Sequence, residues 1–592
     1  MQERISKTWN WIKQNKLIVA IIVAIIVATA VIRLWHFSDW LYFSLDQARD
    51  AELARESFEH GPGNLPLLGA RAAGTFLRLG PVYYYFQALS VQIFNTLDPY
   101  ALAVPDLVFS LLSIPLFYYF LRLFLSVKSS LLATALYSFS FLSIQYSRFA
   151  WNTNALPFWT VLTALSIYKF SSVKEKIKRG RWLVLAALSF AVLSQLHFVA
   201  LAGFGLIGLI ALAVYRPRVN PRHWIYAAGA FVVFYIPMIL SEIATKGANY
   251  EQFKYAIFAK TGDGLPFVFS FVEAVRELSR TFMMFLTSFG EGQEEMFAWV
   301  GFVLIFAGAL LLIRKIKKDK SMRLPAAIVF VWLLVFVFLY AKTDTSLKPR
   351  FFLPLAFFPF LFFGLIADKI MENFKKYGFA FVLVITAIFV GSNANAVFMW
   401  YNYLDTGSEK ALKREIFLKQ SDGVTVKQMK DAVGYMVDKV EKSGNNLCYR
   451  APAARIHGYE YFMLMRLPEE RFHRIKHRMD NKDKCDFFAI SRIDDRTPVD
   501  EDYADDFNLI KREGFGRVAI WDIEPKDLFM NWEEIQKEKE ENKQQKEPPK
   551  KESDEAQEKE KKKKDDSSSN EESRELDRPE RRERVLWKGV FE

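Results

Sequence analysis

The run "IVAIIVAIIVATAVIRLWH" (residues 18–36) decides the class of this protein, because it is long and apolar enough to cross the hydrocarbon core of a bilayer. Four cations precede it: Arg4, Lys7, Lys13 and Lys16. A secretory signal peptide is the competing interpretation. However, the run is long, lacks a small-residue cleavage site and is followed by many similar segments. We therefore interpret it as a retained first transmembrane helix, with residues 1–17 in the cytoplasm.

The rest of the N-terminal two thirds is also typical of a membrane protein. The 592 residues are 51% hydrophobic and 16% aromatic, which is too apolar for several ordinary soluble domains. Segments of membrane-spanning length recur about eleven times, within a range of roughly 11 to 13. They fall near residues 18–36, 103–121, 129–147, 154–171, 181–196, 197–215, 223–241, 297–313, 324–341, 351–368 and 377–397. The fold class is therefore an α-helical polytopic membrane protein.

The formal net charge of +12 does not indicate nucleic-acid binding, because much of the Lys and Arg lies in short loops between spans. Three of these loops are strongly basic: residues 174–181, 215–222 and 314–323. The positive-inside rule places them in the cytoplasm. Alternation from them places four loops outside: 37–102, 148–154, 242–296 and 342–350. We expect a multi-pass protein of the plasma (cytoplasmic) membrane with an extracytoplasmic C-terminal region.

Two further apolar segments test this topology. If "GPVYYYFQALSVQIF" (80–94) crossed the membrane, the two most basic loops would lie on the wrong side. We interpret it as a juxtamembrane or re-entrant helix, which is allowed where protein covers it. The stretch "FSFVEAVRELSRTFMMFLTSF" (269–289) carries charges at helical spacing. We expect it to lie on the outer surface as an amphipathic helix.

The composition changes after residue 400. Residues 401–534 combine a helical pattern (427–444) with strand-like runs at 446–453, 459–465, 485–491 and 516–523, which predicts a small extracytoplasmic α/β domain. Its two cysteines, Cys448 and Cys485, either form a disulfide or lie too far apart, and the sequence leaves this open. Residues 535–592 are charge-dense and predict a disordered tail.

Ionisable side chains are sparse within the spans and gather in the outer loops instead. Transporters usually place acids and bases at the midplane, so this pattern favours chemistry at the outer surface. The first outer loop contains "FSLDQARDAELARES" (43–57), in which Asp46 follows apolar residues where the chain leaves the bilayer. Such a carboxylate suits a general base at a lipid–water boundary. Asp50, one helical turn later, is a second candidate. The other acids nearby suit a charged surface helix.

Other outer segments hold candidate binding residues. The first loop continues with Arg71 and Arg78 among glycines, and then with Tyr83 and Tyr84. Lys348 and Arg350 precede a span, where a guanidinium can hold a phosphate with two hydrogen bonds; interfacial snorkelling is the alternative. The turn "SRFAWNTN" (147–154) offers three side chains that could bind a sugar or pyrophosphate: Arg148, Asn152 and Asn154. His197 is either a base or a histidine that caps a helix end.

Several of these motifs, taken with the topology, resemble a known family. They are the pattern D-x-A-R-x-A-x-x-A-R-E (46–56), G-P-x-Y-Y (80–84), "SRFAWN" and "KPRFFLP". They resemble the polytopic GT-C glycosyltransferases, closest to the family-39-like branch of protein O-mannosyltransferases and lipid A aminoarabinose transferases. The resemblance covers residues 18–400, with 37–102 as the long first outer loop of a GT-C-like catalytic module.

The resemblance implies an enzyme that transfers a sugar from a polyprenyl-phosphate carrier to an acceptor hydroxyl on the outer face, with inversion. The family's loop-one acid corresponds to Asp46, the general base. Arg350, with Lys348, would hold the lipid phosphate. Many members have a second adjacent acid where this chain has Gln47. Either Asp46 therefore acts alone or Asp50 supplies the second carboxylate.

The identity of the acceptor stays open among protein, lipid and glycan. No nucleotide fingerprint is present, and no sequence cluster supports a divalent metal, although one is possible. Two other functional classes also remain open, a transporter and a non-catalytic anchor. A flippase for lipid-linked sugars would need polar residues along a path across the bilayer. A non-catalytic envelope protein would use its spans to anchor the α/β domain.

Overall fold

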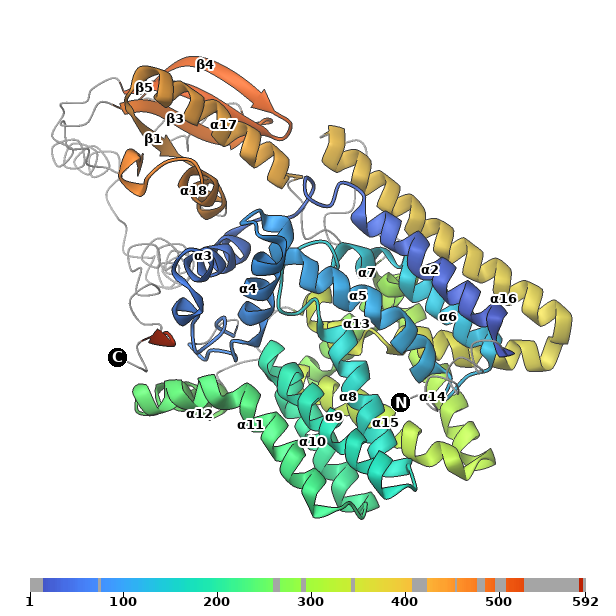
Figure 1. Cartoon of the computed structure of the whole chain (residues 1–592). Helices are drawn as coiled ribbons and strands as arrows, with labels where there is room; N and C mark the ends of the chain where they lie inside the picture. Colours follow the sequence, from blue (N-terminus) through green and yellow to red (C-terminus); the bar gives the residue numbers. More distant parts are fainter. Residues whose placement is uncertain are drawn as a thin grey trace, which may run out of the picture. The chain divides into compact units, whose positions relative to one another are not determined.

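The computed structural model describes residues 14–72, 76–258, 267–288, 294–341, 347–406, 423–452, 455–475, 485–495, 507–525 and 585–588. The chain divides into two compact units (Figure 1). One comprises Met1–Lys427 with Trp587–Glu592, and the other Gln428–Leu586. We describe each unit by itself.

The first unit is helical. Its α-helices are α2 (Lys16–Leu34), α3 (Leu45–His60), α4 (Val82–Phe94), α5 (Pro99–Leu121), α6 (Val127–Phe139), α7 (Phe141–Gln145), α8 (Leu156–Ser172), α9 (Lys176–Leu196), α10 (Phe198–Tyr215), α11 (Pro221–Ala244), α12 (Ala248–Phe258), α13 (Phe267–Leu286), α14 (Glu294–Lys318), α15 (Arg323–Ala341) and α16 (Phe358–Thr406). Within the described residues, three short 3-10 helices lie between them: η1 (Pro62–Asn64), η2 (Lys320–Met322) and η3 (Pro349–Leu355).

The polytopic fold class is confirmed. Seven helices of the described chain are long and apolar enough to cross a membrane: α2, α5, α10, α11, α14, α15 and α16. Helix α16 covers two predicted spans, because its backbone reverses at Lys375, where φ is 49°. The remaining predicted spans fall on α6 with α7, on α8 and on α9. These helices are shorter or, in α9, begin with several cations.

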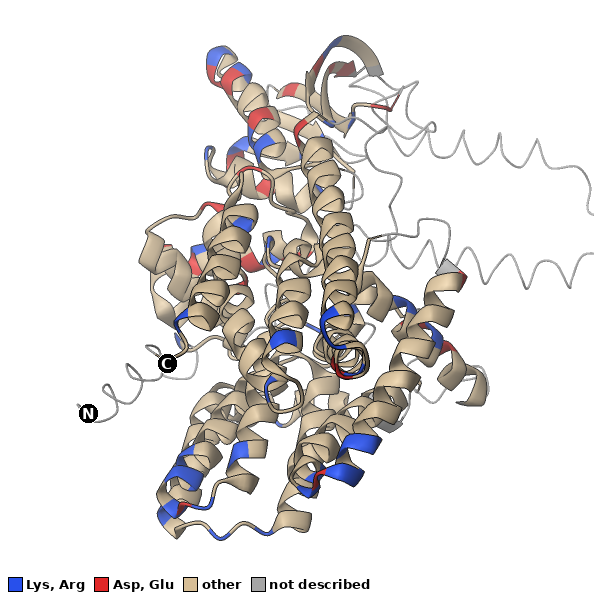
Figure 2. Cartoon of the chain, turned by 90° about the vertical axis from the view of Figure 1, so that its right-hand side faces the viewer, with Lys and Arg blue, Asp and Glu red and all other residues tan. Residues whose placement is uncertain are grey.

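The basic loops share one end of the helical unit. Figure 2 shows Lys and Arg collected where α8 meets α9, where α10 meets α11 and where α14 meets α15. This is the arrangement that the positive-inside rule expects at a single membrane face.

Helix α13 corrects one prediction. The segment 269–289 was expected to lie on the outer surface, yet the half of α13 from Leu278 to Leu286 is buried among α14, α15 and α16. Asn393 of α16 donates a hydrogen bond to the Leu286 carbonyl at 2.8 Å. The charges that suggested an amphipathic helix occupy only its first part, and the following "TFMMFL" is apolar on almost every side. In contrast, α4 has only 13 residues, too few to span the bilayer core.

The second unit is the small α/β domain. Its sheet has the order β2-β1-β3-β5-β4, with β1 (Asn446–Arg450) parallel to β2 (Phe472–Arg474) and β3 (Cys485–Arg492). Strands β4 (Phe507–Phe515) and β5 (Val518–Pro525) complete it in antiparallel pairing. The helices are α17 (Val426–Ser443) and α18 (Ile456–Leu464), with a 3-10 turn, η6 (Glu469–Arg471).

Two sequence-based questions are resolved in this unit. Cys448 of β1 and Cys485 of β3 form a disulfide, with Cα atoms 5.6 Å apart. The strand-like run 459–465 lies mostly in α18, so that prediction is wrong. Ile456, Tyr459 and Phe462 recur at helical spacing and are buried together, and this tertiary burial outweighs the β-propensity of the aromatic residues.

Glu460 of α18 provides a pH-dependent contribution to stability. It accepts hydrogen bonds from Tyr449 of β1, from His457 and from Arg474 of β2. Burial opposes its charge, but these hydrogen bonds hold the pKa of Glu460 well below its ordinary range. A lowered folded pKa stabilises the fold above the unfolded pKa of about 4.3, and this stabilisation is lost progressively as the pH falls below it.

We therefore expect Glu460→Gln to lower the free energy of unfolding by about 1–3 kcal/mol at pH 7. The difference from the unsubstituted protein should shrink as the pH is lowered from 5 to 3. Scanning calorimetry of the full chain measures the loss of stability at pH 7 and its change with pH. Glu470→Gln is the control, since Glu470 is exposed in the same unit. An equal deficit at pH 7 and pH 3 would contradict the assignment.

Candidate active site

Helix α3 is fixed to the turn 147–154 by a single glutamine. Ser44 and Gln47 form a capping box, in which the Ser44 backbone N–H donates to Gln47 Oε1 at 3.2 Å. The same side chain donates from Nε2 to the Ala150 carbonyl at 2.8 Å. The amide thus accepts and donates at once, while buried to 2% exposure. Gln47 is the position at which the sequence resemblance led us to look for a second acid.

The two candidate carboxylates flank one guanidinium. Arg49 Nη1 lies 3.1 Å from Asp46 Oδ1, and Arg49 Nη2 lies 2.8 Å from Asp50 Oδ1. Burial opposes the charge of Arg49, but Tyr84 and both carboxylates raise its pKa well above the ordinary value. Asp46 is 43% exposed and Asp50 only 3%. The pair therefore offers one carboxylate to solvent and one to the interior.

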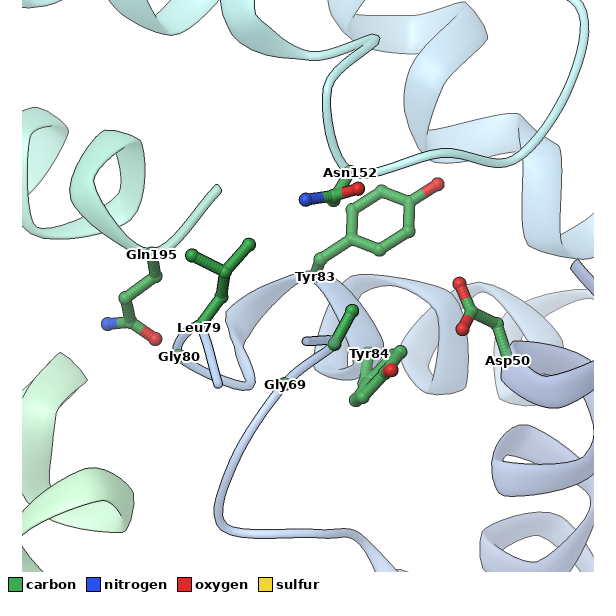
Figure 3. Close-up of a pocket in the computed structure, with 9 residues that line it drawn as sticks. Asp50, Gly69, Leu79, Gly80, Tyr83, Tyr84, Asn152 and Gln195 are labelled. Atoms are coloured by element: carbon green, nitrogen blue, oxygen red, sulfur yellow. The ribbon is translucent and has the colours of Figure 1, made fainter. Parts of the chain in front are cut away.

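Asp50 faces a small, narrow hollow (Figure 3). The hollow is lined by Asp50, Gly69, Ala70, Leu79, Gly80, Tyr83, Tyr84, Asn152 and Gln195. Two glycines set its width. A Cβ atom on Gly69 would lie 2.2 Å from the Gly80 carbonyl oxygen, and one on Gly80 would lie 2.2 Å from Gln195 Oε1. A side chain at either position would therefore collide with the neighbouring atoms that form the wall of the hollow.

Residues 69–72 and 76–79 are joined by backbone hydrogen bonds, and they form one side of the hollow. Gly69 N–H donates to the Leu79 carbonyl at 2.7 Å, and the backbones of Arg71 and Arg78 form an antiparallel β-bridge. The Arg71 guanidinium lies over the Phe76 ring, and the Arg78 backbone bonds the Asn249 side chain. Among the described residues, neither arginine lines the hollow. Their predicted contact with a donor phosphate therefore stays a prediction.

Asp106 of α5 is a buried acid that sequence analysis did not select. Its Oδ2 accepts hydrogen bonds from Tyr83 Oη at 2.6 Å and from the Trp151 backbone at 3.0 Å. Burial and the neighbouring carboxylate raise the pKa of Tyr83 well above its ordinary value, so this phenol remains a donor. An acid inside an apolar span is itself a signal of function, and it could have directed attention here.

Arg350 lies close to the turn 147–154, although it is about 200 residues away in the sequence. It lies in η3, and its guanidinium is 5.4 Å from the centre of the Trp151 ring. Because Trp151 also bonds Asp106, the loop before α16 meets the turn 147–154 beside the hollow. Lys348 lies just before η3 and is exposed.

Two predicted binding residues have structural partners instead. Arg148 is buried to 1% exposure and donates to the carbonyls of Arg33 and His36, at the C-terminal end of α2. The Arg33 carbonyl belongs to the last turn of α2, where carbonyls lack helical partners, so the guanidinium completes this helix end and does not line the hollow. His197 Nδ1 accepts from the Val199 backbone at 3.2 Å and caps α10. Of the two roles considered for His197, the structure therefore shows the histidine that caps a helix end.

The two asparagines of the turn 147–154 differ. Asn152 lines the hollow and donates to the Leu196 carbonyl at 2.7 Å, which ties the turn to α9. Asn154 is buried and donates to the Phe149 carbonyl within the turn. No group of three or more His, Cys, Asp or Glu side chains in the described ranges is arranged to hold a metal ion.

We expect Gln47→Glu to destabilise the fold by about 1–3 kcal/mol, because a carboxylate would replace the amide that donates to the Ala150 carbonyl. Lowering the pH should recover part of this loss, since the protonated carboxyl regains a donor. Thermal unfolding at pH 5 and pH 8 measures both effects. Gln92→Glu makes the same change at an exposed position of α4. Equal unfolding temperatures for the two variants would contradict this role.

Comparison with known proteins gives a family match and a shared fold. Residues 79–240 match the family described as dolichyl-phosphate-mannose-protein mannosyltransferase. No curated protein matches the chain.

Two solved structures of ArnT from Cupriavidus metallidurans have a similar fold. The undecaprenyl phosphate complex has a TM-score of 0.52 and 12% identity, covering 86% of this chain and 98% of that one. The apo structure has a TM-score of 0.50 and 13% identity, covering 84% and 97%. The family match and the shared fold together point to the GT-C glycosyltransferase superfamily, the type that includes aminoarabinose transferases and protein O-mannosyltransferases.

Proposed function

We propose that this protein is a membrane glycosyltransferase that takes a sugar from a polyprenyl-phosphate donor at the outer membrane face. It transfers that sugar to an acceptor hydroxyl with inversion at the anomeric carbon. The observation that carries the proposal is the Asp46–Arg49–Asp50 group at a glycine-walled hollow, at the point where the chain leaves its first span. The family match and the fold support glycosyl transfer in general.

The residues divide the reaction between them. Asp46 is open to solvent and can take the proton of an acceptor hydroxyl as that oxygen attacks the anomeric carbon. Asp50 keeps Arg49 in place, and Arg49 in turn orients Asp46. Tyr83, Tyr84 and Asn152 line the hollow that would receive part of the donor.

The leaving group is a lipid phosphate, which departs with the electron pair of the broken C–O bond. Arg350 can accommodate its charge with two parallel hydrogen bonds. Its guanidinium lies 5.4 Å from the centre of the Trp151 ring, and Trp151 precedes Asn152, which lines the hollow. One protein of this fold, ArnT, binds undecaprenyl phosphate, which supports a lipid phosphate as the carrier here.

The test is sugar transfer by purified protein in lipid. Radiolabelled polyprenyl-phosphate sugars are supplied as a panel, with a membrane extract as acceptor, and donor consumption and labelled product are measured. We expect consumption of at least one donor, with one sugar transferred per lipid phosphate released. Protein-dependent movement of donor between leaflets without consumption would favour a flippase. Neither consumption nor movement of any donor would favour the envelope anchor.

A further inference from the structure

The last described residues of the chain return to the helical unit. Trp587 and Lys588 belong to this unit, although the residues before them, 428–586, belong to the α/β unit. The Trp587 backbone N–H donates to the Leu65 carbonyl at 3.2 Å, and its indole Nε1–H donates to Tyr85 Oη at 2.9 Å. The contact joins residues about five hundred positions apart in the sequence.

Trp587 holds two elements at once. Its backbone bonds the segment after η1, and its indole bonds a side chain of α4. Tyr85 Oη in turn donates to the Pro66 carbonyl at 3.0 Å. The indole, the phenol and the two carbonyls therefore form a closed set of hydrogen bonds between residues 62–66 and α4. Lys588 follows closely, since its Cβ lies 3.5 Å from the place of a Cβ on Gly63.

These contacts lie next to the wall of the hollow. Residues 62–66 are followed, after two intervening residues, by Gly69, whose close approach to Gly80 limits the width of the hollow. Tyr85 follows Tyr83 and Tyr84, both of which line the hollow. A hydrogen bond that fixes Tyr85 therefore acts on the same helical turn as the lining residues.

We propose that Trp587 is a positioning residue of the candidate site, which holds residues 62–66 against α4 and so keeps the donor-binding wall in place. Its effect on activity rests on the proposed glycosyl transfer, whereas the docking itself does not. Trp587 is not among the residues that line the hollow, so its contribution should appear in donor binding and not in the chemical step.

Docking is tested by a disulfide between Gly63→Cys and Lys588→Cys, whose Cβ separation fits that bond. A specific protease site is placed between residues 535 and 584 of the full chain. After cleavage, we expect the C-terminal fragment to stay attached on a non-reducing gel and to be released by reductant. The native disulfide lies wholly before the cut and cannot link the fragments. The control pair is Glu56→Cys with Lys588→Cys. Docking would be overturned if this pair retained the C-terminal fragment equally well, or if the pair Gly63→Cys with Lys588→Cys did not retain it.

Positioning is tested with Trp587→Phe, which keeps a ring and loses the N–H donor. Loss of one neutral hydrogen bond predicts about a fivefold rise in KM for the donor, with kcat and the melting temperature unchanged. Tyr85→Phe should give a similar rise, and the double variant should be no worse than either single one. Trp521→Phe is the control, because it removes an equivalent indole hydrogen bond, to Ser491, in the α/β unit.

Hydrogen exchange gives a readout that needs no activity. Amides of residues 62–70 should exchange faster in Trp587→Phe than in the unsubstituted protein or in Trp521→Phe. Unchanged exchange and unchanged donor KM would overturn the positioning role even if the cross-link forms. If no donor is consumed by any protein while exchange rises, the proposed function fails and the structural role of Trp587 stands.

Discussion

Asp46→Asn should lower kcat for sugar transfer by a factor of about 10² to 10⁴, the range expected when a general base is removed. The amide keeps the size of the side chain but cannot take the acceptor proton. Arg49 retains its bond to Asp50, so the fold and donor binding should persist. Steady-state kinetics, with donor binding measured separately, test this expectation.

Glu56→Gln is the matched control for that variant. Glu56 lies on the same helix, is 42% exposed and pairs with Arg55 much as Asp46 pairs with Arg49. The control should transfer sugar at the unsubstituted rate. Asp50→Asn provides a third comparison, because Asp50 is buried at the hollow. If only Asp50→Asn abolished transfer, the base would be Asp50 and our assignment of Asp46 would be wrong.

Arg350→Met should raise KM for the lipid-linked donor by about ten- to hundredfold, since charge-assisted hydrogen bonds to a phosphate are worth about 1.5–3 kcal/mol. Arg350→Lys should recover only part of this, because an ammonium lacks the planar fork that binds two phosphate oxygens. Both variants should keep their unfolding temperature, as the contact with Trp151 is one of many in that region.

Lys348→Met removes a cation two residues away and serves as the control. Lys348 is exposed, and a charge in that setting contributes little. A donor KM that rises equally in both variants would indicate general electrostatic attraction to the phosphate. An unchanged KM in Arg350→Met would contradict a phosphate contact altogether.

The membrane helices were predictable because the bilayer allows few alternatives. An apolar segment of about 20 residues must satisfy its backbone groups internally, which makes it a helix. The segments 269–289 and 459–465 were predicted wrongly for the opposite reason. Both have local patterns that fit more than one environment, and burial against distant helices or strands decided the outcome.

The candidate site was only partly predictable. The acids Asp46 and Asp50 stand out in a short motif at the end of a span. Asp106 does not, since its partners Tyr83 and Trp151 lie 23 and 45 residues away. Arg148 looked available in a loop, yet the structure uses it to complete a helix end.

The sequence by itself determined that this is a multi-pass helical membrane protein with an acidic motif in the loop after its first span, because the length of an apolar segment and the positions of charges can be read locally. Only the tertiary structure decided which charges face a hollow, whether the two cysteines pair and where Trp587 binds. Those outcomes depend on contacts between residues far apart in the chain, which local patterns do not encode.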